Sequence, residues 1–137
     1  MPSFLALDVG TRTIGLARAD TRALLPTPHS TLARKGVRLD CDRLERICQE
    51  LEVVQLVVGL PYELDGGEGR SARLARQVGE ELQRRTGLPL AWQDERYSTV
   101  EASERLRAAG WTARQQKDRI DPAAAAVILE AYLSSKT

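Results

Sequence analysis

The chain is poor in residues that bind soft metals or form disulfides. Its 137 residues include two cysteines, one histidine and no CxxC pair, so neither a zinc site nor a disulfide framework is expected. Cys41 and Cys48 share helical spacing with the apolar residues Leu44, Ile47 and Leu51. This spacing predicts two reduced thiols on or near the core-facing stripe of a helix.

Long apolar runs and a basic leader are also missing. The apolar start of the chain stops at Asp8, whereas a membrane span needs about 20 apolar residues. A secretory leader would need a basic start followed by a longer apolar stretch. We therefore expect a cytoplasmic protein with no membrane partner.

A marked excess of positive charge is absent too. The formal net charge of +1 excludes a uniformly basic coat for nucleic acid, so polyanion binding would require local clusters. Three clusters are present: Arg34, Lys35 and Arg38; Arg70, Arg73 and Arg76; and Arg114, Lys117 and Arg119. Each alone is typical of a solvated surface, and only a place beside an acidic metal site would indicate a substrate track.

Length and hydrophobic periodicity together predict the architecture. A chain of this length suffices for one core, so we expect a single domain over residues 1–137. The pattern predicts strands over 4–9, 13–19, 24–32, 53–59 and 90–93, and helices over 39–51, 71–85, 98–109 and from Asp121 onward. Pro26 and Pro28 mark the third strand as an irregular edge strand. This order predicts an α/β fold with a mixed sheet.

Three acidic residues follow or begin elements that could meet. Asp8 ends the first strand, Glu95 follows the last strand, and Asp121 begins the final helix. Carboxylate oxygens from separate elements suit Mg²⁺ or Mn²⁺, which need neither cysteine nor histidine. Each acid also has a structural alternative, because Asp8 could stabilise a turn, Asp121 could cap its helix, and Glu95 could pair with Arg96.

A glycine-rich loop is the second candidate feature. The segment DGGEG at 65–69 precedes a helix that carries Arg70 and Arg73. Its backbone N–H groups and the helix N-terminus suit a phosphate, although a flexible surface turn is the usual role of such a loop. Tyr97 and Trp111 could stack on bases, but packing is the more common use of a tryptophan.

Four blocks, taken in order, resemble the YqgF/RuvX family of proteins assigned to pre-16S rRNA maturation or Holliday-junction resolution. They are LALDVGTRTIGLARAD (5–20), GLPYELDGGEG (59–69), DERYSTVEA (94–102) and IDPAAAAVILEAYL (120–133), and the resemblance covers nearly the whole chain.

The resemblance implies an RNase H-like α/β fold with a five-stranded mixed sheet flanked by helices. It also implies that Asp8, Glu95 and Asp121 are the catalytic and metal-binding acids of a nuclease that uses Mg²⁺ or Mn²⁺. Substrate contacts are expected from the basic residue of the DxGxK/R pattern, the glycine loop and nearby arginines: Arg12, Gly67, Gly69, Arg70, Arg73 and Arg96. Asp118 is an alternative or auxiliary metal ligand to Asp121.

Other functions remain open at this stage. The first block also resembles the phosphate-binding hairpin of actin-like ATPases and sugar kinases, but those proteins close two such lobes around a nucleotide. A non-catalytic nucleic-acid-binding module is a further alternative. Among nuclease substrates we expect RNA ahead of branched DNA, and a monomer or weak dimer, because paired cuts in a four-way junction need a twofold dimer and no apolar stripe is left over for its interface.

Overall fold

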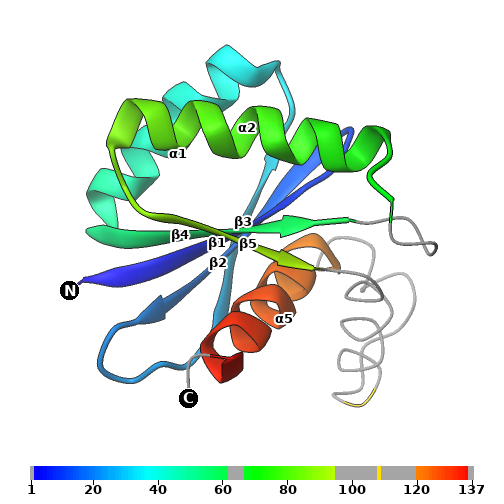
Figure 1. Ribbon diagram of the computed structural model, residues 1–137. Coiled ribbons are helices and arrows are strands. Elements are labelled where there is room, and N and C mark those ends of the chain that lie inside the picture. The colour runs from blue at the N-terminus through cyan, green and yellow to red at the C-terminus, as the bar shows by residue number, and fades with distance from the viewer. Residues whose placement is uncertain (1, 62–66, 95–107, 109–119, 136–137) are drawn as a thin grey trace.

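The structure is a computed structural model that describes residues 2–61, 67–94, 108 and 120–135, without the side chains of Ile120 and Asp121. In these ranges the strands are β1 (Ser3–Val9), β2 (Thr13–Asp20), β3 (Thr27–Ala33), β4 (Val53–Leu60) and β5 (Leu90–Asp94). The helices are α1 (Val37–Glu50), α2 (Arg70–Thr86) and α5 (Ile120–Ser135) (Figure 1). The predicted helix over 98–109 lies outside the described residues.

The five strands form one mixed sheet in the order β3-β2-β1-β4-β5. β1, β2 and β3 pair antiparallel, as the predicted hairpin requires, whereas β4 pairs parallel with both β1 and β5. The β2–β3 register shifts between Leu16 and Ala17, where Pro28 becomes the partner of Ala17. A proline cannot donate to the ladder, so the prediction of an irregular edge strand is confirmed.

Helices cover both faces of the sheet. On one face Leu5, Leu7 and Val9 of β1 join the main core with α1 and α2. On the other face Phe4 and Ala6 pack with α5, as the twofold alternation of a strand requires. β4 is buried from Leu56 to Leu60, which is typical of a central parallel strand with both faces covered.

The helices end and pack as the apolar pattern predicted. α2 stops at Gly87, whose φ of 71° is left-handed and whose N–H donates to the Gln83 carbonyl, the usual glycine end of a helix. Cys41 and Cys48 are buried on α1 and free. Burial raises the pKa of the two thiols to about 11 and about 12, so both stay protonated at neutral pH.

None of the helices within the described ranges combines the length and the apolarity that a membrane span needs.

Candidate active site

Asp8 lies at the carboxyl end of β1, on the face of the sheet that α5 covers. It is the penultimate residue of the strand, is half-buried and pairs in register with Gly15 of β2. Strand alternation places it on the same side as Phe4 and Ala6, which pack with α5. The strand therefore presents this carboxylate at the sheet edge, beside the helix that carries Asp121.

β4 and β5 reach the same edge as β1. The three strands are parallel, and Leu60 and Asp94, the last residues of β4 and β5, are partners in register. The exposed Asp94 is followed directly by Glu95. Glu95 and Arg96 lie outside the described residues, but the chain enters that segment from the edge that carries Asp8.

α5 runs opposite to β1 along the sheet. Near its end Tyr132 contacts Phe4, with ring centroids 6.4 Å apart, and further toward its start Ala125 and Ala126 pack against Ala17. The first turn of α5, which contains Asp121, therefore lies toward the carboxyl ends of the parallel strands (Figure 1).

The ends of β1 and β5 and the start of α5 thus lie at one edge of the sheet. Of the three predicted acids, only Asp8 has a side chain that the structure describes. The side chain of Asp121, like Glu95 and Asp118 as a whole, lies outside the described residues. Among the side chains that are described, no three of the His, Cys, Asp or Glu type group closely enough to hold a metal ion.

The turn between β1 and β2 places the predicted substrate contact Arg12 at the same edge. Gly10 donates its N–H to the Thr13 carbonyl at 2.8 Å, and a Cβ at Gly10 would lie 3.1 Å from that oxygen. This close approach explains the glycine. Arg12 itself is exposed in the turn.

Four more of the predicted substrate contacts lie at or just before the start of α2. Gly69 is the N-cap residue in an extended conformation, without a side-chain cap, and its carbonyl accepts the Arg73 N–H at 3.2 Å. Gly67, Arg70 and Arg73 are exposed. Because α2 follows β4, these residues also belong to the carboxyl edge, whereas 62–66 lie outside the described residues.

Arg76 differs from the other two arginines of its cluster. Its guanidinium binds Glu68 with two hydrogen bonds of 2.6 and 2.7 Å and lies 5.0 Å from the centroid of the Trp92 ring. The hydrogen bonds from Arg76 lower the pKa of Glu68. Arg76 therefore ties the loop before α2 to β5, a role that the three-residue spacing did not reveal.

Arg34 also proves to be a structural residue. Its Nε donates to Asp40 at 2.7 Å and its Nη1 donates to the Gly10 carbonyl at 2.8 Å, and its side chain is only 10% exposed. The sequence grouped it with Lys35 and Arg38 as a surface cluster, and only those two are exposed. The local signal for this structural role was Asp40, an acidic residue in the first turn of the next helix, α1.

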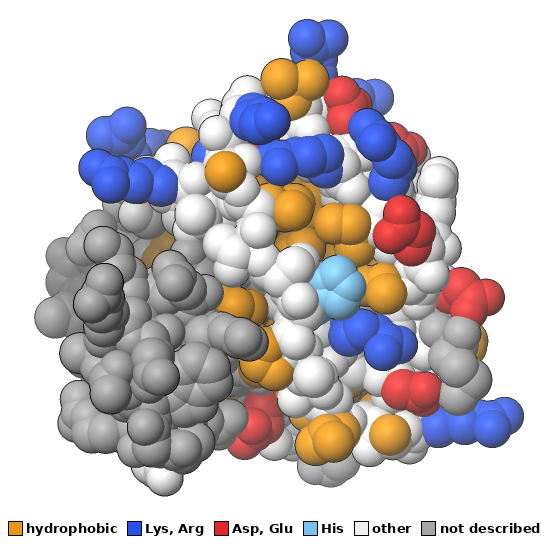
Figure 2. All heavy atoms as spheres, turned by 180° about the vertical axis from the view of Figure 1, so that it is seen from behind, with side chains coloured by type: hydrophobic (Ala, Val, Ile, Leu, Met, Phe, Trp, Pro, Cys, Tyr) orange, Lys and Arg blue, Asp and Glu red, His pale blue; other side chains and the backbone are white. Residues whose placement is uncertain are grey.

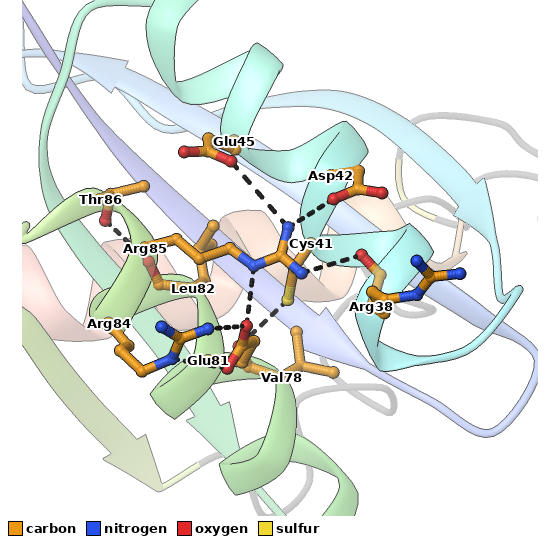
Figure 3. A network of polar contacts seen from close by, with 10 residues as sticks. All are labelled: Arg38, Cys41, Asp42, Glu45, Val78, Glu81, Leu82, Arg84, Arg85 and Thr86. Carbon is orange, nitrogen blue, oxygen red and sulfur yellow. Dashed lines mark hydrogen bonds and ion pairs between the residues drawn. The ribbon is translucent and has the colours of Figure 1, made fainter.

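A second polar network joins the two helices at the other end of α2 (Figure 3). Arg85 donates to Asp42 and Glu81 and to the carbonyl of Arg38, so it clamps α1 to α2. An adjoining cavity of about 370 Å³ is lined by Glu45, Cys48, Gln49, Glu52, Val53, Arg85, Thr86 and Leu88. The start of α2, not this end, belongs to the candidate site.

Basic and acidic side chains are interspersed on the face around His29 on β3, although Lys and Arg gather toward the top of that view (Figure 2). This agrees with the small net charge. Any polyanion track must therefore be local, as the sequence indicated.

Comparison with known proteins covers nearly the whole chain. The protein family described as "RuvX: Holliday junction resolvase" matches residues 2–135. A protein of Anaeromyxobacter sp. (strain Fw109-5) named "Putative pre-16S rRNA nuclease" is 44% identical over 133 residues, which are 97% of each chain. A protein of the same name from Thermosynechococcus vestitus is 39% identical over all 137 residues and 91% of its own length.

Among solved structures, T. thermophilus RuvC in complex with a Holliday junction substrate superimposes with a TM-score of 0.62. The match covers 99% of this chain and 96% of that chain at 13% identity, so it bears on the fold alone. With the sheet order described above, it confirms the predicted RNase H-like α/β fold with a five-stranded mixed sheet.

Proposed function

Because the chain belongs to the RuvX family, we propose that it is a metal-dependent nuclease of the cytoplasm that hydrolyses phosphodiester bonds in RNA. We further propose that its substrate is the 5′ end of pre-16S rRNA, which it trims during ribosome biogenesis. The observation that carries this proposal is the half-buried Asp8 at the edge where β1, β4 and β5 end. The names of the near full-length relatives support the substrate.

Asp8, Glu95 and Asp121 are the residues that would hold the metal ions. Oxygen ligands at a sheet edge fit hard cations such as Mg²⁺ and Mn²⁺. The sequence next to each of the three acids contains neither histidine nor cysteine. Bound divalent ions would activate a water molecule and stabilise the leaving oxygen of the phosphodiester.

Basic residues around the same edge would bind the phosphates of the substrate. Arg12 in the β1–β2 turn and Arg70 and Arg73 at the start of α2 are exposed there. Gly67 and Gly69 would offer backbone N–H groups at the helix N-terminus, and Arg96 would act beside Glu95. These contacts would position the strand without reading its bases.

A Holliday junction is the alternative substrate, and the family description and the fold of RuvC favour it. Two symmetric cuts across a junction require a twofold dimer with two metal sites at a defined separation. A stable dimer typically buries about 800 Å² on each partner. We propose a monomer or weak dimer instead, because the core-facing stripes of α1 and α2 are already packed against the sheet.

The test is a cleavage assay on a 5′-extended 16S precursor and on a four-way DNA junction, with Mg²⁺, Mn²⁺ or EDTA. Asp8→Asn, Glu95→Gln and Asp121→Asn should each abolish cleavage while circular dichroism stays unchanged, because each removes ligand charge at nearly constant shape. Asp118→Asn is the matched control on the same segment and should retain substantial activity.

Three results would reject the proposal or part of it. Near wild-type cleavage by one of the first three variants would remove that residue from the site. A tight dimer in light scattering, with paired nicks in the junction and no RNA cleavage, would establish the resolvase. RNA binding without cleavage in either Mg²⁺ or Mn²⁺ would show that the protein is a non-catalytic binding module.

A further inference from the structure

One arginine links the turn that follows Asp8 to a buried carboxylate. The Nη1 of Arg34 donates to the Gly10 carbonyl at 2.8 Å, and its backbone N–H donates to the Arg12 carbonyl at 2.8 Å. Its Nε donates to Asp40 at 2.7 Å. Two hydrogen bonds from Arg34 therefore hold residues 10–12, although Arg34 lies 22 to 24 positions further along the chain.

The carboxylate that orients Arg34 is itself held rigidly. Asp40 is fully buried in the first turn of α1. Its oxygens also accept the Lys35 N–H at 2.8 Å and an Nη2 hydrogen bond from Arg43 at 2.9 Å. The next residue, Cys41, packs in the main core. The position of the Arg34 guanidinium is thus set by the core, because its partner cannot move independently of α1.

We propose that Arg34 is a positioning residue for the nuclease reaction. It acts through the Gly10 carbonyl, two residues after Asp8, and keeps the end of β1 and the turn with Arg12 in a single conformation. This inference rests on the proposed function, since Asp8 is taken as a metal ligand. Groups that orient metal ligands from behind commonly change metal affinity or activity by about ten- to hundredfold when removed.

A direct phosphate contact is the competing role for Arg34. A phosphate contact needs a guanidinium that reaches solvent, and the side chain is only 10% exposed and already bonded to Asp40 and Gly10. A phosphate contact would also change the salt dependence of RNA binding. A positioning residue would leave that dependence unchanged, which separates the two roles.

The decisive variant is Arg34→Lys, with Arg43→Lys as the matched control. A lysine ammonium carries its three N–H donors on one nitrogen, so it can replace one of the two side-chain bonds of Arg34 but not the rigid fork that spans both. Arg43 donates to the same carboxylate, and its other bond goes to the Ala33 carbonyl instead of the turn. Both variants should therefore loosen the Asp40 network, and only Arg34→Lys should loosen the turn.

Three measurements follow on each protein: Mn²⁺ affinity without nucleic acid by calorimetry, amide hydrogen exchange of residues 8–14, and steady-state RNA cleavage. For Arg34→Lys we expect Mn²⁺ affinity and kcat to fall about tenfold or more, faster exchange, and little change in KM or in the salt dependence of binding. Arg43→Lys should match the wild type in all of these. If Arg34→Lys does not fold, Asp40→Asn tests the same link from its other end.

The outcomes separate this inference from the function on which it rests. Equal Mn²⁺ affinity and equal exchange in the Arg34→Lys and Arg43→Lys variants would overturn it. A loss confined to RNA affinity, with a smaller salt dependence, would make Arg34 a phosphate contact and would also overturn it. If the wild type neither binds Mn²⁺ nor cleaves RNA, the proposed function fails, and the exchange of residues 8–14 then decides whether Arg34 holds the turn.

Discussion

The ring of Trp92 on β5 lies directly over Gly79 in the middle of α2. A Cβ built at Gly79 would come within 2.8 Å of the Trp92 Cη2 atom and 3.3 Å of a Val58 methyl carbon. A glycine in a helix interior ordinarily costs about 1 kcal/mol relative to alanine. Here it allows α2 to approach the sheet closely enough for the Trp92 ring to pack against the helix backbone.

Gly79→Ala should therefore destabilise the protein, although the same change stabilises most helices. Overpacking of a core typically costs about 1–3 kcal/mol, which exceeds the gain in helix propensity. Guanidinium unfolding should show a lower midpoint with an unchanged slope. In a Trp92→Leu background the ring is gone, so Gly79→Ala should be neutral or stabilising there. An equal loss in both backgrounds would mean that Trp92 is not the obstacle.

The buried Asp40 predicts acid-sensitive stability. Burial alone would raise the pKa of this carboxyl, but hydrogen bonds from Arg34, the Lys35 N–H and Arg43 outweigh burial and lower it. Because the folded-state pKa lies below the unfolded value of about 4, the contribution to stability is present above that pH. It is lost as the pH falls through the folded-state pKa.

Asp40→Asn should thus lower the free energy of unfolding by about 3 kcal/mol at pH 7, since it leaves two arginines without their buried counter-charge. The gap between variant and wild type should shrink below about pH 4. Urea unfolding between pH 7 and pH 3 measures this. Glu50→Gln, at an exposed position on the same helix, should cost little at any pH, and a gap independent of pH would contradict the assignment.

The exposed start of α2 predicts a sequence-independent loss of RNA affinity. Arg70→Ala combined with Arg73→Ala should weaken binding by a similar factor for different sequences, because phosphate contacts do not read bases. For single-stranded RNA the slope of log affinity against log salt should fall by about 1.4, about 0.7 for each contact. Filter binding between about 50 and 200 mM salt, the range over which such losses are large, gives both quantities.

Arg84→Ala is the control for this pair of arginines. Arg84 is exposed near the other end of the same helix, where it binds Glu81 at 2.6 Å, so its removal should change neither affinity nor slope appreciably. Equal effects of Arg84→Ala and the Arg70/Arg73 double variant would show general electrostatic attraction instead of a local track. A loss for one sequence only would indicate base recognition.

Local patterns were sufficient for the elements that the structure describes. The alternating pattern in 4–9 and 13–19 predicted β1 and β2 to within a few residues, and the apolar run at 53–59 predicted β4. The four-residue spacing of Leu74, Val78 and Leu82 predicted α2. α1 begins at Val37, two residues before the predicted start. These patterns are readable because burial of one face imposes the period of the element on the sequence itself.

The candidate site was only partly readable in this way. The position of Asp8 at the end of a strand followed from local pattern, and the four sequence blocks indicated the family. Glu95 and Asp121 were likewise candidates from their places after the last strand and at the start of the final helix, the resemblance implied their catalytic role, and their joint role with Asp8 stays a prediction. The edge at which they would meet depends on the parallel pairing of β4 with β1 and β5, which spacing along the chain does not encode.

The sequence by itself determined the described elements, the reduced cysteines and the family, because each depends on residues close together in the chain or on motifs read in order. Only the tertiary structure decided which arginines remain exposed for a substrate. Arg34 and Arg76 looked like their neighbours in sequence, yet they bind the Gly10 carbonyl, Asp40 and Glu68. A charged side chain takes its role from the partners that folding brings within hydrogen-bond distance, and the Gly10 carbonyl lies 24 residues from Arg34 in the chain.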